Sequence, residues 1–221
     1  MTKKSNQEDD FSVIRFILDV FVDVALVVVL VIVFRQFLFA PFQVSGPSMC
    51  DTFNMYGDEC ANGDGEYVIT SRLGTWDVFG FSLGNIDRGD VVVFEAPYGS
   101  EGEYYIKRII GIAGDSVRIE DGEVYLMKDG ESEYVMLEEP YLNEDNLGAT
   151  QTASDAVEVY EVPEGEYFLM GDNRIKSSDS RRCFHRAGCN DVRDNFLEHG
   201  FIQGEVKFVT YPFSHVRWIS S

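Results

Sequence analysis

Ser48 and Lys107 are the two residues of this sequence whose types and surroundings best suit covalent catalysis. Ser48 follows a Gly-Pro pair within the stretch 42–52, which places its hydroxyl in a sharp turn. Lys107 stands between Tyr105 and Ile109 in an apolar run, and in a strand these three side chains share one face. Burial lowers the pKa of an amine, and a neutral amine can take the proton of a serine hydroxyl. The two residues therefore predict a serine nucleophile with a lysine base.

Each of these two residues also has a simpler interpretation. A serine after Gly-Pro is commonly a turn residue, and a lysine in a strand commonly carries its head group to water along a buried stem. A serine–histidine–aspartate triad has no obvious base, because the histidines all lie late, in polar or terminal segments: His185, His199 and His215. The stretch around Ser48 does not match the nucleophile-elbow motif of α/β-hydrolases either, since Cys50 stands where the last glycine of that motif belongs.

A third polar stretch, residues 171–181, directly follows the apolar residues 167–170. Its Gly, Asp and Asn suit a tight turn, and its serines and charged residues offer hydroxyl and carboxylate groups to neighbouring strands. A turn followed by a solvated loop is the alternative. The density of small hydrogen-bonding side chains is nevertheless more than a loop needs.

The four cysteines fall into two pairs that are each close in sequence: Cys50 and Cys60, and Cys183 and Cys189. Such pairs suit short disulfide loops in a domain that faces an oxidising compartment, and three pairings are possible. A structural zinc site is weakly supported because its ligands usually stand two to four residues apart. A catalytic cysteine is less favoured still, since no histidine is placed to suggest its base. We expect neither a metal nor a cofactor.

The formal net charge of -20 argues against a nucleic-acid partner, because phosphate backbones require clustered Lys and Arg. The acidic residues are spread along the chain, and a solvated acidic face is the simplest interpretation.

Residues 16–34 are nearly all apolar, and their nineteen residues at about 1.5 Å each would cross about 28 Å, close to the hydrocarbon thickness of a bilayer. Asp19 and Asp23 interrupt this run on one helical face. A cleaved signal peptide is the alternative, but the run is longer than the usual apolar region and no small-residue cleavage site clearly follows it. We therefore predict a short tail at 1–15, then a transmembrane anchor with an aromatic interfacial collar at 16–40.

The orientation of this span follows from the basic residues beside it. Lys3, Lys4 and Arg15 precede the span and Arg35 follows it, which favours a cytoplasmic N-terminus. We expect a single-pass protein of the cell membrane with its folded domain on the extracytoplasmic side, where the cysteines could pair.

Residues 41–221 have the pattern of a mainly β domain without a long amphipathic helix. Asp121-Gly122 between two alternating runs is a strong hairpin signal. The strand candidates are 67–71, 88–94, 104–112, 117–126, 166–170 and 205–211. We interpret residues 139–156, which are acidic and low in apolar content, as an exposed insertion.

In four ordered blocks the sequence resembles the type I signal peptidases, the membrane-bound serine/lysine endopeptidases of family S26. The blocks are residues 45–49, 88–94, 105–115 and 171–181. The likeness covers the anchor and nearly all of the β domain. It implies a mostly antiparallel β catalytic domain of signal-peptidase type, with an exposed apolar surface that rests on membrane lipid.

The resemblance also implies roles for individual residues. It makes Ser48 the nucleophile and Lys107 its general base, with Ser177 as the hydroxyl that hydrogen-bonds and orients the lysine. Behind the site it implies a structural ion pair and a second supporting pair: Asp179 with Arg181, and Arg108 with Asp172.

Two positions depart from the pattern that the resemblance suggests. Members often continue the serine block as Met-x-Pro-Thr, and Asp51 stands in place of that proline. Gly46 stands where some members carry a second serine that helps the oxyanion hole, while others have glycine there. The backbone N–H of Ser48 would still be one oxyanion donor.

The implied activity is cleavage of N-terminal signal peptides from exported preproteins. The implied substrates have small side chains at the first and third positions before the cleaved bond. Two alternatives stay open at this point. One is a related membrane serine/lysine peptidase with narrow or self-cleaving specificity. The other is a catalytically silent, membrane-tethered β module that binds exported proteins.

Overall fold

A computed structural model describes residues 5–57, 59–61, 63–75, 77–78, 81–82, 84–97, 100, 102–152, 158–185 and 195–219. The chain divides into two compact units, Met1–Phe39 and Ala40–Ser221, which are described separately below.

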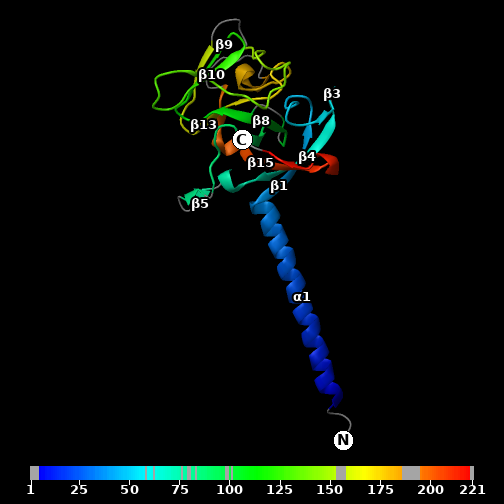
Figure 1. Cartoon of the computed structure of the whole chain (residues 1–221). Helices are drawn as coiled ribbons and strands as arrows, with labels where there is room; N and C mark the ends of the chain where they lie inside the picture. Colours follow the sequence, from blue (N-terminus) through cyan, green and yellow to red (C-terminus); the bar gives the residue numbers. More distant parts are fainter. Residues whose placement is uncertain are drawn as a thin grey trace. The chain divides into compact units, whose positions relative to one another are not determined.

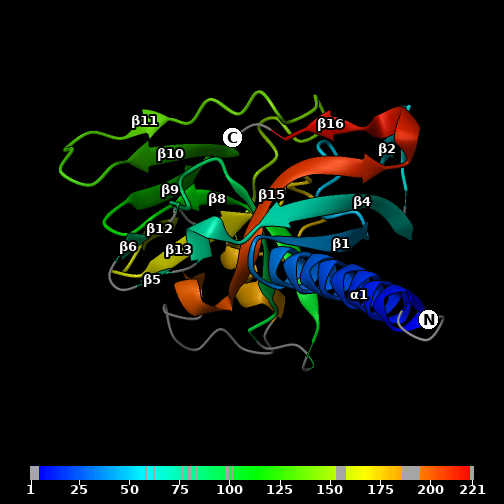
Figure 2. The same cartoon turned by 90° about the horizontal axis from the view of Figure 1, so that it is seen from below.

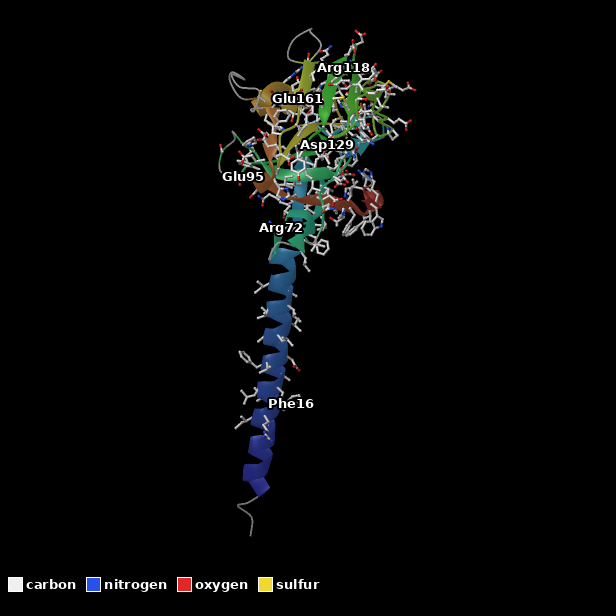
Figure 3. The ribbon with its side chains drawn as sticks, turned by 90° about the vertical axis from the view of Figure 1, so that its left-hand side faces the viewer. Phe16, Arg72, Glu95, Arg118, Asp129 and Glu161 are labelled. Carbon is white, nitrogen blue, oxygen red and sulfur yellow. A yellow bond between two sulfur atoms is a disulfide. The ribbon has the colours of Figure 1, made fainter. Side chains whose placement is uncertain are left out.

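Helix α1 (Ser5–Phe37) makes up most of the first unit (Figure 1). It begins well before the apolar run, so the predicted tail at 1–15 is helical from Ser5 onward. A Ser with Glu8 three residues later, followed by two aspartates, is a favourable helix start, because acidic groups near the N-terminus complement the helix dipole. The described side chains between Val13 and Ile32 are exposed, and Figure 3 shows Phe16 pointing away from the helix.

No helix in the part of the chain that the structure describes combines the length and the apolarity needed to cross a membrane.

The second unit is built on antiparallel strands, which confirms the mainly β prediction. In the described residues the large sheet has eight strands, seven of them in one row, and β16 (Arg217–Trp218) pairs with β15. The row is, in order, β1 (Phe39–Ser45), β4 (Asp64–Ser71), β15 (Ile202–Tyr211), β7 (Val91–Glu95), β8 (Tyr104–Gly111), β13 (Glu166–Met170) and β14 (Leu197–Glu198). Figure 2 shows β1, β4 and β15 side by side. Part of the predicted collar therefore belongs to the edge strand β1, where Pro41 is tolerated because an edge strand needs fewer donors.

A second sheet of four described strands contains the predicted hairpin. Its order is β11 (Val135–Met136), β10 (Glu123–Met127), β9 (Ser116–Glu120) and β12 (Glu158–Glu161). The turn between β9 and β10 has positive φ at both central residues, 52° at Asp121 and 88° at Gly122. Two positive φ angles define the type I′ turn, whose twist matches that of the strands, so the Asp-Gly prediction is confirmed.

The remaining short elements connect these sheets. Two hairpins pair β2 (Met55–Tyr56) with β3 (Glu59–Cys60) and β5 (Asp77–Val78) with β6 (Phe81–Ser82). Described 3-10 turns are η1 (Leu73–Thr75), η2 (Ser180–His185), η4 (His199–Phe201) and η5 (Phe213–His215).

The central strands β7 and β8 are buried on both faces. Val91 and Val93 pack in one apolar cluster with Phe53 and Val206, while Phe94 packs on the opposite face in a cluster with aliphatic and aromatic side chains of β8, β13 and β14. This explains why neither strand alternates apolar and polar residues: β7 is an apolar run up to Phe94, and β8 has apolar residues on both faces beside Lys107 and Arg108. The sheet thus offers a dry interior in which a charged side chain of β8 must find partners or lose its charge.

Replacing Gly122 should destabilise the hairpin more than an ordinary Gly→Ala change at positive φ. A methyl group there would strike the backbone of Gly148, and alanine also disfavours the φ of 88°. We expect Gly122→Ala to lower the free energy of unfolding by about 2–3 kcal/mol, measured by denaturant titration. Gly130→Ala is the matched control, because Gly130 has φ 77° but open space around it. Equal losses in the two variants would contradict the proposed steric contact.

Candidate active site

Ser48 and Lys107 meet in the structure although they lie far apart in the sequence. Ser48 stands in the turn that follows β1, and Lys107 lies in β8 opposite Val92 of β7. The Nζ atom of Lys107 is 2.7 Å from Oγ of Ser48, and it donates a second hydrogen bond of 2.8 Å to the carbonyl of Ile106. This distance permits direct proton transfer between hydroxyl and amine.

The amine of Lys107 is almost completely removed from water, with 4% of the residue exposed. Burial lowers its pKa from 10.5 to about 8, although the nearby carboxylates of Asp179 and Asp172 act in the opposite direction. No carboxylate forms an ion pair with Lys107 among the described residues. About a tenth of the amine is therefore neutral at pH 7, and about half at pH 8.

The neighbouring Arg108 has the partners that Lys107 lacks. Its guanidinium forms a two-bond pair with Asp172, at 2.9 and 2.8 Å, and donates to the carbonyl of Gly89 at 2.7 Å. Thr52 completes the group, because its hydroxyl donates to Asp172 and accepts from Arg108. The ring of Tyr141 covers the guanidinium at 3.9 Å. The expected Arg108–Asp172 pair is present, and Thr52 and Tyr141 are members that we did not predict.

Asp179 and Arg181 form the expected ion pair, with distances of 2.8 and 2.7 Å and both residues at most 1% exposed. Burial alone would raise the pKa of Asp179, but Arg181 and the backbone N–H of Gly171 hold it below its usual value. Ser180 anchors the same loop, since its hydroxyl accepts from the backbone N–H of Leu169 at 2.9 Å. The carboxylate is therefore a permanent negative charge behind Lys107.

Ser177 is buried, but the hydrogen bond to Lys107 that the resemblance implies is not formed. Its hydroxyl has no well-formed hydrogen bond among the described residues, although it lies near enough to Asp179 to help lower the pKa of that carboxyl. The role of Ser177 in orienting the lysine stays a prediction.

Gly171 is the residue where two parts of the site approach most closely. A methyl group at this position would overlap both the hydroxyl of Ser177 and the carbonyl of Ser48. That carbonyl in turn accepts a 3.1 Å hydrogen bond from the backbone N–H of Asn173. Glycine is therefore required for the turn after β13 to pack against the turn that carries Ser48.

The segment at 139–156 is not simply an exposed insertion. Its residues 153–156 lie outside the described part, but Glu139 pairs through both carboxylate oxygens with the buried Arg174. Arg174 also donates to the hydroxyl of Thr150 at 2.8 Å. This segment packs against the β domain at Glu139 because the buried guanidinium of Arg174 requires a carboxylate partner. No local signal distinguishes Glu139 from Glu138, so the sequence could not identify this contact.

One of the predicted cysteine pairs is formed within the described residues. Cys50 and Cys60 are joined by a disulfide that closes the loop after Ser48. Cys183 is buried and disulfide-bonded, and Cys189 lies outside the described residues.

The histidines do not contact Ser48 where their side chains are described. His199 hydrogen-bonds to the hydroxyl of Tyr167 at 2.9 Å, and His215 to the carboxylate of Glu66 at 3.0 Å. The described residues also contain no group of three side chains that could hold a metal ion.

A cavity of about 120 Å³ opens beside Ser48 and Lys107. Its apolar lining includes Val68, Val93 and Ile106. Gly46, directly after the lining residue Ser45, has φ 81° and no atom near the position of a side chain. The space next to the hydroxyl is thus small, and polar groups such as those of Gln43 and Ser45 line it together with the apolar side chains.

Comparisons with known proteins identify the family of this chain. The family model described as "Signal peptidase, peptidase S26" matches residues 17–211. The chain is 31% identical to signal peptidase I of Bacillus licheniformis over 197 residues, which covers 88% of each chain. It is 31% identical to signal peptidase I S of Bacillus subtilis over 198 residues, 88% of this chain and 89% of the relative. A crystal structure of a signal peptidase I from Enterococcus faecalis aligns with TM-score 0.40 and 26% identity, covering 55% of this chain and 97% of the other.

These relatives and the β fold define a serine peptidase, a hydrolase. The chain belongs to the signal peptidase family, peptidase S26.

Proposed function

We propose that this protein cleaves signal peptides from exported preproteins, with Ser48 as nucleophile and Lys107 as general base. The observation that carries the proposal is the 2.7 Å contact between the serine hydroxyl and an amine whose pKa burial lowers to about 8. A catalytically silent binding module would have no use for such an amine, since burying it without a carboxylate partner is costly. The names of the relatives in Bacillus support the choice of substrate.

The reaction follows from the positions of these two groups. Neutral Lys107 takes the proton of the Ser48 hydroxyl as Oγ attacks the scissile carbonyl carbon. The lysine ammonium then gives that proton to the departing amine, which breaks the peptide bond and leaves an acyl-enzyme. Water attacks the ester after giving a proton to Lys107, and the proton returns to Oγ of Ser48 as the acid product leaves. The residues return to their starting protonation states.

The developing oxyanion needs a hydrogen-bond donor next to Ser48. The backbone N–H of Ser48 makes no hydrogen bond to the described residues, so it is free to donate to the oxyanion.

The small cavity beside Ser48 supports the proposed specificity. Its volume of about 120 Å³ can hold a substrate side chain, and Val68, Val93 and Ile106 supply the apolar part of its lining. Alanine and similar small residues, which precede the cleavage point of signal peptides, can be accommodated there.

We further propose that α1 tethers the enzyme to the cell membrane, with the β domain on the extracytoplasmic side. The apolar run of residues 16–34 and the exposure of its valines and leucines, such as 58% for Val27 and 57% for Leu30, support this. The disulfide between Cys50 and Cys60 supports an oxidising compartment for the β domain.

Removing either member of the pair should abolish cleavage of a preprotein in detergent. We expect Ser48→Ala and Lys107→Met each to lower kcat/KM about 1,000-fold or more, because nucleophile and base act together. Ser132→Ala and Lys128→Met, which change the same residue types at exposed positions, are the controls. Activity within tenfold of wild type in either test variant would refute the assignment of that residue.

The pH dependence should report the protonation of Lys107. Because only the neutral amine is a base, kcat/KM should rise with pH and level off above about 8. The stability should change in the same direction. The folded lysine has the lower pKa, so between about 8 and 10.5 the unfolded state binds more protons, and the free energy of unfolding increases with pH.

The comparison of wild type with Lys107→Met across this range isolates the lysine. The variant should lose the stability increase between pH 8 and 10.5, measured by denaturant titration at several pH values. An identical increase in both proteins would show that the amine is not desolvated.

The proposed tether can be tested in whole cells by alkaline carbonate extraction of membranes. A Val28→Arg, Leu30→Arg double variant should lose membrane retention, because each arginine at the centre of a span costs about 3 kcal/mol. Glu133→Arg, at an exposed position of the β domain, is the charge control. Full retention of the double variant would contradict anchoring by α1.

A further inference from the structure

Asp51, three residues after Ser48, has an unusual backbone conformation. Its φ is 128°, a region that residues with a side chain rarely adopt and that a proline ring forbids. The proline that the family resemblance leads us to expect at this position is thus incompatible with the turn as it is built here. A strained residue persists only when its surroundings hold it.

The carboxylate of Asp51 is held by the segment that contains Asn143 and Asn146. It accepts a 2.9 Å hydrogen bond from the backbone N–H of Asn143. The side-chain amide of Asn146 donates to both of its oxygens, at 3.2 and 3.0 Å. Burial raises the pKa of Asp51, and these hydrogen bonds act in the opposite direction.

Asn146 connects three parts of the chain. It is only 3% exposed, and besides Asp51 its amide donates to the side chain of Asn143 at 3.2 Å. Its oxygen accepts a 3.3 Å hydrogen bond from the backbone N–H of Ile175. The segment around Ile175 also holds Ser48, through the bond from the backbone N–H of Asn173 to the carbonyl of Ser48.

Asp51 and Ser48 belong to one hydrogen-bonded turn. The backbone N–H of Cys50 donates to the carbonyl of Pro47 at 3.1 Å, and that of Phe53 donates to the carbonyl of Met49 at 2.8 Å. The first bond closes the turn that contains Ser48, and the second spans Asp51, so the φ of Asp51 is coupled to the direction of the preceding backbone. A change at Asp51 therefore changes where the hydroxyl of Ser48 points.

We propose that Asp51 and Asn146 are positioning residues that hold the turn of the nucleophile in register with Lys107. This inference rests on the proposed function, because it takes Ser48 as the nucleophile. Neither residue touches the scissile bond. Their hydrogen bonds hold the strained φ of Asp51, and with it the short distance between hydroxyl and amine.

The fold should survive loss of this contact, because other groups restrain the same turn. The disulfide holds Cys50, and the hydroxyl of Thr52 bonds to Asp172. Arg217 donates to the carbonyl of Thr52 at 2.5 Å and pairs with the buried Glu66. A catalytic defect can therefore be separated from unfolding.

The test uses the full chain in detergent and compares Asp51→Ala, Asp51→Gly, Asn146→Ala and the Asp51→Ala, Asn146→Ala double variant. A small displacement of a reacting group can cost about 100-fold in rate, so we expect partial misplacement to lower kcat about tenfold with little change in KM. The double variant should be no worse than the poorer single variant, because both changes remove the same contact.

Asp51→Gly separates the carboxylate from the backbone strain, since glycine accepts a positive φ without cost. We expect it to be as slow as Asp51→Ala. Glu144→Gln is the matched control, because Glu144 is an exposed carboxylate of the same segment, and it should retain the wild-type kcat. Thermal unfolding of each variant gives the folded fraction.

Several outcomes would overturn the inference. These are a kcat of Asp51→Ala or Asp51→Gly within twofold of wild type, multiplicative losses in the double variant, or a loss explained entirely by the unfolded fraction. Failure of the proposed function is distinguishable, because it would appear as an active Ser48→Ala variant in the same assay.

Discussion

The structure depends on how it accommodates positive charge in a dry interior. Four basic side chains lie behind or beside Ser48 with at most 4% of each residue exposed: Lys107, Arg108, Arg174 and Arg181. Each arginine is paired with a carboxylate, from Asp172, Glu139 and Asp179 respectively. Lys107 instead faces a hydroxyl and a carbonyl. Since an arginine stays charged and a lysine can lose its proton, the group left without a carboxylate is the one that can act as a base.

The antiparallel register of β8 determines which residues form these pairs. Arg108 lies opposite Met170, the last residue of β13, so the turn that follows can return Asp172 to the guanidinium. Buried ion pairs contribute little net stability, but loss of one partner is costly. Their effect here is geometric: Arg108 on β8 holds the turn that carries Asp172, Arg174 holds the acidic segment through Glu139, and Arg181 with Asp179 braces the loop after β13. The acidic segment after β11 is held in the same way, since the carboxylate of Glu139 neutralises the buried guanidinium of Arg174.

Several distant parts of the chain hold the turn after Ser48 and so help to position the hydroxyl of this serine. It is tied by a disulfide within its own loop, by Asp172 after β13, by Asn146 in the acidic segment and by Arg217 near the C-terminus. A nucleophile held from several directions loses little entropy when the reaction begins. A tightly determined backbone also allows a strained residue such as Asp51 to persist next to the site.

Local features of the sequence were sufficient for part of this description. The Asp121-Gly122 turn follows from short-range backbone preferences, and the apolar run around Lys107 follows from the composition of a strand that is buried on both faces. Ser48 and Lys107 could be paired as a hypothesis because their chemistry is complementary. Local features do not choose the partners of the buried arginines: the resemblance to a family supplied Asp172 for Arg108 and Asp179 for Arg181, and nothing in the sequence supplied Glu139 for Arg174. Arg108 and Asp172 are 64 positions apart, and Glu139 and Arg174 are 35 apart. Only strand register and loop packing select such partners, because many acidic residues of this chain have similar local sequences and burial alone decides which of them must be paired.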